Sequence, residues 1–342
     1  MKPRYLRFAA VLALSVSFAL PAAQAGAVRL PARQDAAASG VTGGTLFGGT
    51  MSLVPEQGAL GRKLAIVRVY YMIGQKFKTP KIDQVMSAGS TVLASLDIPH
   101  GHGITFASVA AGRQDTQISA WLTGAEQEAV AHNVPTVYVS FEHEANDSAN
   151  NVLGTPAQFQ AAWKHIHSLA AAAHLNVATG GRLRWAMILE HLAYFSVSQR
   201  PHWSLRLGFA SQYYPGAGNV DVIAADGYNR GGCRSHKGNT PSQPAVSPGS
   251  LFGPVLTFAS THGGLPVFFA EWASAFYSGV PAWQANFIDQ MKAYVLANPR
   301  IAAVLYWNSK GFFGCQFAVT GHPQSLAALA AMGRVVNGRL AG

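Results

Sequence analysis

The stretch Pro266-Val267-Phe268-Phe269-Ala270, followed directly by Glu271 and Trp272, decides which fold this chain is expected to adopt. Its residues are apolar without interruption, which is typical of a parallel strand that is buried on both faces. A carboxylate directly after such a run is costly unless it is paired or hydrogen-bonded. We therefore expect a buried strand that ends at an acid with either a structural or a chemical role.

Seven further runs of this kind lie along the chain and alternate with longer helical patterns. Eight strand–helix units in one chain favour a single (β/α)8 TIM barrel over an open doubly wound sheet. No Gly-x-Gly-x-x-Gly segment follows the first run, which argues further against the open sheet. The other runs are Thr45–Gly48, Ile66–Tyr71, Thr91–Leu96, Thr136–Phe141, Arg184–Leu189, Val222–Asp226 and Ala303–Trp307.

Three helices have readable limits. The clearest begins after Thr155 as N-cap, with Pro156 in the first helical position and Gln158 as the reciprocal capping residue. A second is expected from about Pro281 to Leu296, where apolar residues recur at helical spacing, and a third near Ser325 to Val335.

The N-terminus has the pattern of an export signal. Three basic residues precede an apolar or small-residue stretch at 8–20, and the small-residue site Ala23-Gln24-Ala25 follows. This pattern predicts a signal peptide over residues 1–25. A stretch of 13 residues is shorter than the roughly 20 that span a bilayer, so we expect no membrane span.

The predicted organisation is therefore a signal peptide, a short leader and one domain. Residues 26–43 are rich in Gly and Ala and are interpreted as a flexible leader, and residues 44–342 as the catalytic barrel. We expect a secreted protein, extracellular or periplasmic, that acts as a monomer.

The composition is that of a globular protein with few charges. The chain has 342 residues, of which 49% are hydrophobic and 12% charged, against about 25% charged in typical soluble domains. Its formal charge of +10 falls to +7 when the three basic residues of 1–25 are removed. We treat the remaining basic residues as scattered and expect no nucleic-acid partner. An anionic polysaccharide stays open as a partner.

The acidic residues are few, and six of the 15 end or follow a predicted strand. Catalytic groups of a TIM barrel lie at these strand ends. Two carboxylates that face each other across a sugar can cleave a glycosidic bond, one as proton donor and the other as nucleophile or base. We choose Glu144 and Glu271, because they follow the fourth and seventh strands, roughly opposite around the ring. Structural ion pairs remain the alternative for each of the six, which are Asp97, Glu142, Glu144, Glu190, Asp226 and Glu271.

The segments around this pair resemble a known family. Phe141-Glu142-His143-Glu144-Ala145-Asn146 resembles the His-Glu-x-Asn motif of glycoside hydrolase family 26, retaining enzymes of clan A that include β-mannanases. Pro266–Trp272 is similar to the strand 7 motif of that family, in which the Glu is the nucleophile. Weaker similarities at Gly61–Lys63, Val222–Asn229 and Val304–Asn308 extend the resemblance over about residues 44 to 335.

The resemblance implies roles for individual residues. Glu144 would be the acid/base, Glu271 the nucleophile, and Tyr228 a hydrogen-bonding partner that orients the nucleophile. Three further residues would contact the reacting sugar, with Trp307 as its hydrophobic floor beside His143 and Asn146. The segment 147–154 lacks the aromatic residues that mannanases of the family usually carry there, so the resemblance implies hydrolysis without fixing mannan as the substrate.

Three other features were singled out. Trp272 is a candidate for stacking on a sugar ring, because indole offers a flat apolar face beside Glu271. His100, in the sequence Pro99-His100-Gly101-His102, is expected to contact sugar hydroxyls, with a His-x-His metal site as the alternative. Cys233 and Cys315 are the only cysteines and are expected to form a disulfide in an oxidising compartment.

The function that we expect is a secreted retaining glycoside hydrolase, β-mannanase-like, that cleaves β-glycosidic bonds of a polysaccharide without a metal or cofactor. Two alternatives stay open. The first is a non-catalytic carbohydrate-binding barrel, and the second is a hydrolase or lyase of an anionic envelope or extracellular polysaccharide.

Overall fold

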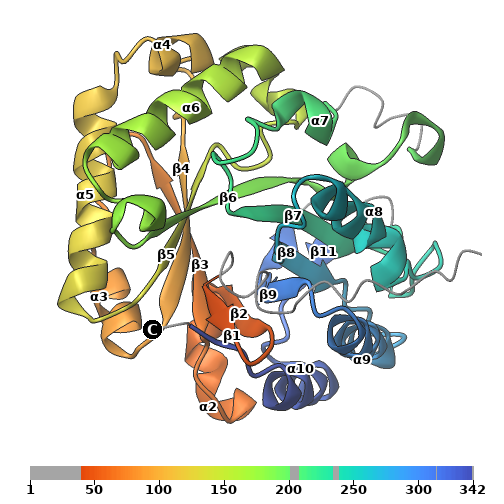
Figure 1. Cartoon of the computed structure of the whole chain (residues 1–342). Helices are drawn as coiled ribbons and strands as arrows, with labels where there is room; N and C mark the ends of the chain where they lie inside the picture. The colour runs from red at the N-terminus through yellow and green to blue at the C-terminus, as the bar shows by residue number, and fades with distance from the viewer. Residues whose placement is uncertain (1–39, 201–207, 234–238, 313, 341–342) are drawn as a thin grey trace, which may run out of the picture. The chain divides into compact units, whose positions relative to one another are not determined.

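A computed structural model describes residues 40–200, 208–233, 239–312 and 314–340 (Figure 1). The predicted signal peptide at 1–25 and all but the last residues of the predicted leader lie outside the described residues. Eight parallel strands form a closed barrel, and β9 pairs with β2 to complete it. The strands are β2 Leu46–Thr50, β3 Ile66–Met72, β4 Thr91–Asp97, β5 Val137–Phe141, β6 Leu183–Glu190, β7 Val222–Asn229, β8 Val267–Ser274 and β9 Ile301–Tyr306. Each predicted run overlaps one of them, so the (β/α)8 barrel is confirmed.

Helices lie around the outside of the barrel (Figure 1). The α-helices are α2 Gln57–Leu60, α3 Pro80–Ser87, α4 Phe106–Ala110, α5 Asp115–Ala131, α6 Pro156–Ala172, α7 Ala210–Tyr213, α8 Pro248–Thr261, α9 Ala282–Ala297 and α10 Pro323–Val335. The 3-10 helices are η1 Met51–Glu56, η2 Ser148–Leu153, η3 Val177–Thr179, η4 His191–Tyr194 and η5 Val197–Gln199. Over the described ranges, no helix has both the length and the hydropathy that crossing a bilayer requires.

The three helices with predicted limits are confirmed. Helix α6 begins with the expected capping box, in which Thr155 Oγ1 accepts from the Gln158 amide at 3.3 Å and Gln158 Oε1 accepts from the Thr155 amide at 2.9 Å. These two bonds satisfy amide groups that the first helical turn would otherwise leave unpaired. Helices α9 and α10 begin within two residues of their predicted starts.

Two small antiparallel pairs lie outside the barrel. Strand β1 (Val41–Thr42) pairs with β12 (Arg339–Leu340). Val41 and Thr42, which were expected in the flexible leader, therefore belong to the folded part. The main chain of β10 (Lys310–Phe312) pairs with β11 (Cys315–Gln316) after the last barrel strand. The predicted disulfide between Cys233 and Cys315 is present and ties the segment after β7 to this hairpin.

The barrel interior changes from apolar to polar along the strands. An interior cluster that includes Ile66, Leu93 and Phe268 fills the end where the strands begin. Side chains two residues apart on a strand face the same side. Arg68 and Ser95, two positions further along β3 and β4, are therefore also interior, and both are buried. This polar layer forms the floor of the end where the predicted carboxylates lie.

Candidate active site

A β-bulge on β8 directs Glu271 into the barrel. Ala225 of β7 pairs with Phe269, whereas the next residue, Asp226, pairs with Glu271, so β8 carries one extra residue at this point. Ala270 belongs to the interior cluster, and strict alternation would turn the residue after it outward. Because the bulge shifts the alternation by one residue, Ala270 and Glu271 both face the interior.

The same bulge turns Trp272 outward, so the expectation that Trp272 stacks on a sugar is wrong. Its side chain is 0% exposed and belongs to the apolar layer between barrel and helices. Its ring meets Tyr306 edge-on, with centroids 5.0 Å apart, and lies 6.4 Å from the ring of Phe287 on α9. Trp272 therefore supports β8 from behind and does not reach the end of the barrel.

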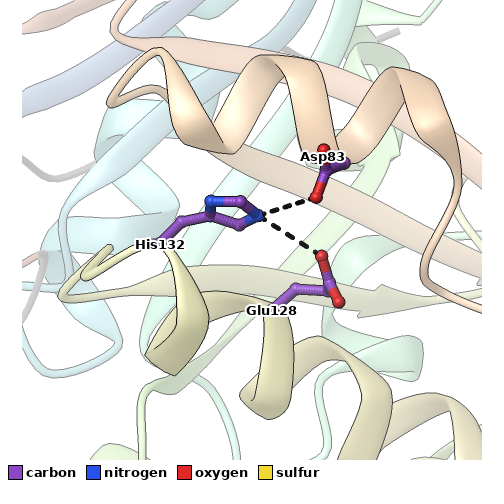
Figure 2. A group of neighbouring side chains, drawn as sticks. All are labelled: Asp83, Glu128 and His132. Carbon is purple, nitrogen blue, oxygen red and sulfur yellow. Dashed lines mark hydrogen bonds and ion pairs between the residues drawn. The ribbon is translucent and has the colours of Figure 1, made fainter.

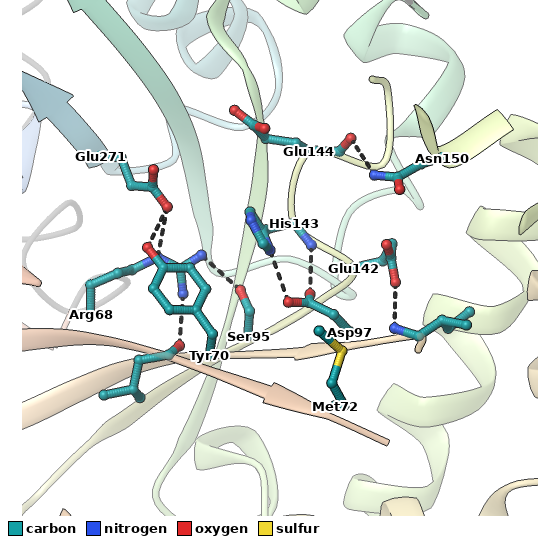
Figure 3. A network of polar contacts seen from close by, with 12 residues as sticks. Arg68, Tyr70, Met72, Ser95, Asp97, Glu142, His143, Glu144, Asn150 and Glu271 are labelled. Atoms are coloured by element: carbon teal, nitrogen blue, oxygen red, sulfur yellow. Dashed lines mark hydrogen bonds and ion pairs between the residues drawn. The ribbon is translucent and has the colours of Figure 1, made fainter. Parts of the chain in front are cut away.

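Glu271 is held by three side chains from two strands. The hydroxyl of Tyr70 donates to Oε1 and the hydroxyl of Tyr228 donates to Oε2, and Arg68 Nε lies 3.7 Å from Oε1 (Figure 3). Burial, and then the charge of Glu271, raise the pKa of both tyrosines well above the usual range. Both hydroxyls are therefore protonated donors, and they stabilise the carboxylate charge while fixing its orientation.

Arg68 is the central residue of this group that the sequence analysis did not identify. Its side chain is 0% exposed. Its guanidinium donates to the carbonyls of Val69 and Leu93 at 3.1 and 3.2 Å and to Ser95 Oγ at 2.8 Å. It also lies 4.3 Å from the centre of the Tyr70 ring. The buried cation therefore compensates the carboxylate charge and holds Tyr70 in place.

Glu144 reaches the site on a turn of unusual backbone conformation. Glu142 and Glu144 have φ angles of 47° and 52°, in the left-handed region that side chains other than Gly rarely adopt. Two bonds hold this turn. The Glu144 amide donates to the carbonyl of Ile188 at 3.0 Å, and Asn150 Nδ2 donates to the carbonyl of Glu144 at 3.0 Å. The Glu144 carboxyl group thereby points toward Glu271 (Figure 3).

The two carboxyl groups have different surroundings. Burial, and then the nearby charge of Glu271, raise the pKa of Glu144 to about 8. A carboxyl group with such a pKa carries a proton at neutral pH and can give it to a leaving group. Glu271, with its two hydroxyl donors and the guanidinium, offers electron pairs instead. Chemically, such a pair can supply a proton from one carboxyl group and an electron pair from the other.

His143 is fixed by Asp97, another residue to which the sequence analysis gave no role. Asp97 Oδ1 accepts from the His143 amide at 3.1 Å, and Oδ2 lies 3.0 Å from Nδ1 of the ring. Burial lowers the pKa of His143, but Asp97 outweighs it and raises this pKa to about 9. The ring is half-buried beside Tyr70, with centroids 5.3 Å apart. His143 is thus a charged donor at the site.

Glu142, although it follows β5 directly, has a structural position. Its Oε2 accepts from the Ile98 amide at 2.7 Å, and the side chain is buried. Burial, and then the charge of Asp97, raise its pKa to about 8. Glu142 therefore links the ends of β4 and β5 under the His143–Glu144 turn.

The remaining predicted residues lie in three kinds of position. Trp307 and Tyr228 are half-buried at the site, and the Trp307 ring meets Tyr70 edge-on at 6.0 Å. His100 is exposed, and its Nε2 lies 3.0 Å from Asn150 Oδ1, next to the Glu144 turn. Asn146 is 0% exposed, and its Oδ1 accepts from the Glu190 amide at 3.0 Å. Asn146 therefore positions β6, and its contact with a sugar stays a prediction, since its Nδ2 has no hydrogen-bond partner among the described residues.

A cleft of about 910 Å³ opens beside Arg68 and Tyr70, two of the residues that hold Glu271. Tyr70, Arg68 and Trp307 form its inner end, η1 lines one wall, and the segment after β3 lines the other. A space of this size accommodates several sugar residues or a comparable ligand. Glu271 does not itself line this groove, but Arg68 and Tyr70, which hold its carboxylate, do.

Asp83, Glu128 and His132 form a separate cluster between α3 and α5 (Figure 2). His132 Nε2 lies 3.1 Å from Asp83 Oδ1 and 3.5 Å from Glu128 Oε2. A cation of the chain is already there, because Lys78 Nζ donates to Glu128 Oε1 at 2.7 Å. We interpret the cluster as an ion-pair network that joins the two helices.

Comparison with known proteins supports the fold. No protein-family model and no curated protein sequence matches this chain. A family 26 β-mannanase from Bacteroides ovatus superposes with a TM-score of 0.58 at 13% identity, over 89% of this chain and 92% of that one. A fungal β-1,4-galactanase gives 0.55 at 14% identity, over 86% and 100% of the chains. A family 5 xyloglucanase from Paenibacillus pabuli superposes with a TM-score of 0.54 at 11% identity, over 82% of this chain and 90% of that one. At such identities the likeness concerns the barrel fold alone.

Proposed function

We propose that this protein is a secreted glycoside hydrolase that cleaves β-glycosidic bonds of a polysaccharide with retention of configuration. The observation that carries the proposal is the contrast between Glu271, which accepts from two tyrosine hydroxyls, and Glu144, whose pKa is raised to about 8. One carboxylate is ready to attack and the other carboxyl group is ready to donate a proton. The glycosidases among the structural neighbours agree with this assignment.

In the first step Glu144 gives its proton to the glycosidic oxygen while a Glu271 oxygen bonds to the anomeric carbon. The bond between that carbon and the leaving oxygen breaks, and its electron pair stays on the oxygen. In the second step Glu144 takes a proton from water, the water oxygen attacks the anomeric carbon, and Glu271 is released. His143, a donor that points into the site, would bind a hydroxyl of the sugar, and Trp307 would pack against its apolar face.

The finer assignments are also part of the proposal. A β-mannan-type backbone is supported by the His143–Asn146 motif and by the mannanase among the structural neighbours. Secretion is supported by the signal-peptide pattern at 1–25 and by the Cys233–Cys315 disulfide, a bond typical of oxidising compartments.

The test is reducing-end release from a panel of β-linked polysaccharides, with the anomeric form of the first product followed by proton NMR. We expect the β-anomer to appear first and Glu271→Gln to abolish release. Asp289→Asn, which removes an exposed carboxylate on α9, is the matched control and should leave the rate unchanged. First appearance of the α-anomer would exclude retention, and binding without release from any polymer would favour a non-catalytic carbohydrate-binding barrel.

A further inference from the structure

The charged side chains that line the cleft beside Arg68 and Tyr70 are all basic. Four basic side chains, Arg68, Lys76, Lys78 and Lys81, are among the residues that line it, and none of the lining residues is Asp or Glu. From the sequence, the basic residues are expected to be scattered. The structure instead places three lysines of one short segment in the lining of a single groove.

Two of these four charges are already compensated within the chain. Arg68 lies 3.7 Å from Glu271, and Lys78 donates to Glu128 at 2.7 Å. Lys76 and Lys81 are exposed, and neither forms a hydrogen bond or ion pair with any residue that the structure describes. Two uncompensated ammonium groups therefore line a groove that also contains Arg68 and Tyr70, the residues that hold Glu271.

The position of Lys81 is unfavourable for the helix on which it lies. Helix α3 begins after Thr79, with Pro80 in the first position, so Lys81 lies in the first turn. A cation there opposes the helix dipole, although Asp83 in the same turn acts in the opposite direction. Residues that break a local rule in this way are expected mainly at functional sites.

The cleft also has a direction relative to the bond that is cleaved. Tyr70, which binds the nucleophile, lines it, and no residue of the Glu142–Asn150 segment does. The nucleophile bonds to the sugar that supplies the anomeric carbon, whereas the acid faces the leaving group. The cleft therefore lies nearer to the residues that hold Glu271 than to Glu144, and we infer that it takes the sugars on the side of the anomeric carbon.

We propose that the substrate of this site is an acidic polysaccharide, whose carboxylate or sulfate groups pair with Lys76 and Lys81 on that side of the cleaved bond. This inference rests on the proposed function. It names the class of substrate, since a neutral chain leaves both ammonium groups without a partner. Exposed ion pairs contribute little singly, so their effect is one of selection between acidic and neutral chains.

The test uses the full chain carrying Glu144→Gln, so that polymers stay intact. Its binding to β-1,4-polymannuronate, a sulfated β-1,4-mannan and neutral β-1,4-mannan is measured. The three polymers share one backbone, and the first two distinguish carboxylate from sulfate. We expect at least one acidic polymer to bind more tightly than mannan, and 0.5 M NaCl to weaken that binding. Adding Lys76→Gln and Lys81→Gln should weaken it about three- to tenfold. Lys164→Gln, which removes an exposed charge on α6 outside the cleft, should not.

The outcomes separate this inference from the proposed hydrolysis. Three results would each overturn the acidic substrate, even where the wild type cleaves mannan. They are equal binding of acidic and neutral polymers, absence of binding to either acidic polymer, and binding that Lys76→Gln and Lys81→Gln leave unchanged. Lysine-dependent binding of an acidic polymer, together with no cleavage of any polymer of the panel by the wild type, would support the acidic ligand and contradict the hydrolysis.

Discussion

The hydroxyl of Tyr70 donates a hydrogen bond to Oε1 of Glu271, although the two residues are 201 positions apart in the sequence. Tyr70 lies on β3 and Glu271 on β8, so the bond crosses the barrel interior. The same ring lies over the guanidinium of Arg68 and beside the rings of His143 and Trp307. Tyr70 thus connects Glu271, the proposed nucleophile, with the residues that would contact the sugar.

Removing this hydroxyl should slow the reaction more than it affects folding. A hydrogen bond to a charged group contributes about 1.5–3 kcal/mol, so we expect Tyr70→Phe to lower kcat/KM by roughly 10- to 100-fold. The control is Tyr71→Phe, because the Tyr71 hydroxyl donates to the carbonyl of Phe77 at 2.8 Å and not to Glu271. Initial rates and thermal unfolding of both variants provide the measurement. A kcat/KM for Tyr70→Phe equal to that of Tyr71→Phe would contradict the role of Tyr70.

The raised pKa of Glu144 predicts the alkaline limit of the activity. Glu144 must carry its proton to act as an acid, and its pKa is raised to about 8, so kcat/KM should fall as pH rises through about 8. Glu142 also has a pKa near 8, and it provides the control. Both variants are assayed on an aryl glycoside whose leaving group needs no proton. We expect Glu142→Gln to keep the fall of kcat/KM above pH 8 and Glu144→Gln to lose it. If kcat/KM of Glu144→Gln still falls above pH 8, the alkaline limit belongs to another residue.

The architecture could be predicted from the sequence because each barrel strand is a short apolar run, and the capping box at Thr155 marks one helix start without ambiguity. The orientation of side chains around Glu271 could not be predicted from the sequence. Period-two alternation places Trp272 and Ala270 on one face, whereas the bulge separates them. A bulge is one added residue and leaves no mark in an apolar run. Trp272 was expected at the site only because it follows Glu271 directly and offers a flat apolar ring, which does not say which face of β8 it occupies.

Arg68 and Tyr70 were missed for a different reason, although a signal was present. Both lie within the run Ile66–Tyr71, which was interpreted only as a buried strand. An arginine in such a run, two positions after the interior residue Ile66, must face the barrel interior, where it needs an acid. In a chain with 15 acidic residues, that argument would have pointed to the carboxylates at the strand ends.

The protons retained by Glu142 and Glu144 predict how stability depends on pH. Their pKa values rise from 4.5 in the unfolded chain to about 8 in the folded protein. Between pH 4.5 and 8 the folded state holds protons that the unfolded state releases, so the free energy of unfolding should fall as pH rises. The slope is at most about 1.4 kcal/mol per pH unit for each group. His143, raised from 6.5 to about 9, acts in the same direction, since its contribution is complete below 6.5 and is lost as pH rises through 9.

Urea unfolding at pH 5, 6.5 and 8 measures this slope. Glu142→Gln keeps an acceptor for the Ile98 amide and carries no proton to lose, so we expect a smaller decrease of stability between pH 5 and 8 than in the wild type. Asp289→Asn, at an exposed position on α9, should keep the wild-type slope. A Glu142→Gln variant whose stability falls from pH 5 to 8 as steeply as that of the wild type would contradict the proton assigned to Glu142.

The disulfide should stabilise both the fold and the site. Cys233 and Cys315 are 82 residues apart, and closing a loop of that length in the unfolded chain contributes typically about 2–4 kcal/mol. The hairpin that it anchors continues into Phe317, whose ring lies 5.2 Å from the ring of Tyr228. Since Tyr228 binds Glu271, we expect Cys233→Ser with Cys315→Ser to lower both the unfolding midpoint in urea and kcat/KM. Dithiothreitol should reproduce both losses in the wild type and change neither quantity in the double variant. A wild type that keeps its midpoint and its activity in dithiothreitol, while alkylation shows both thiols to be free, would contradict the role given to this bond.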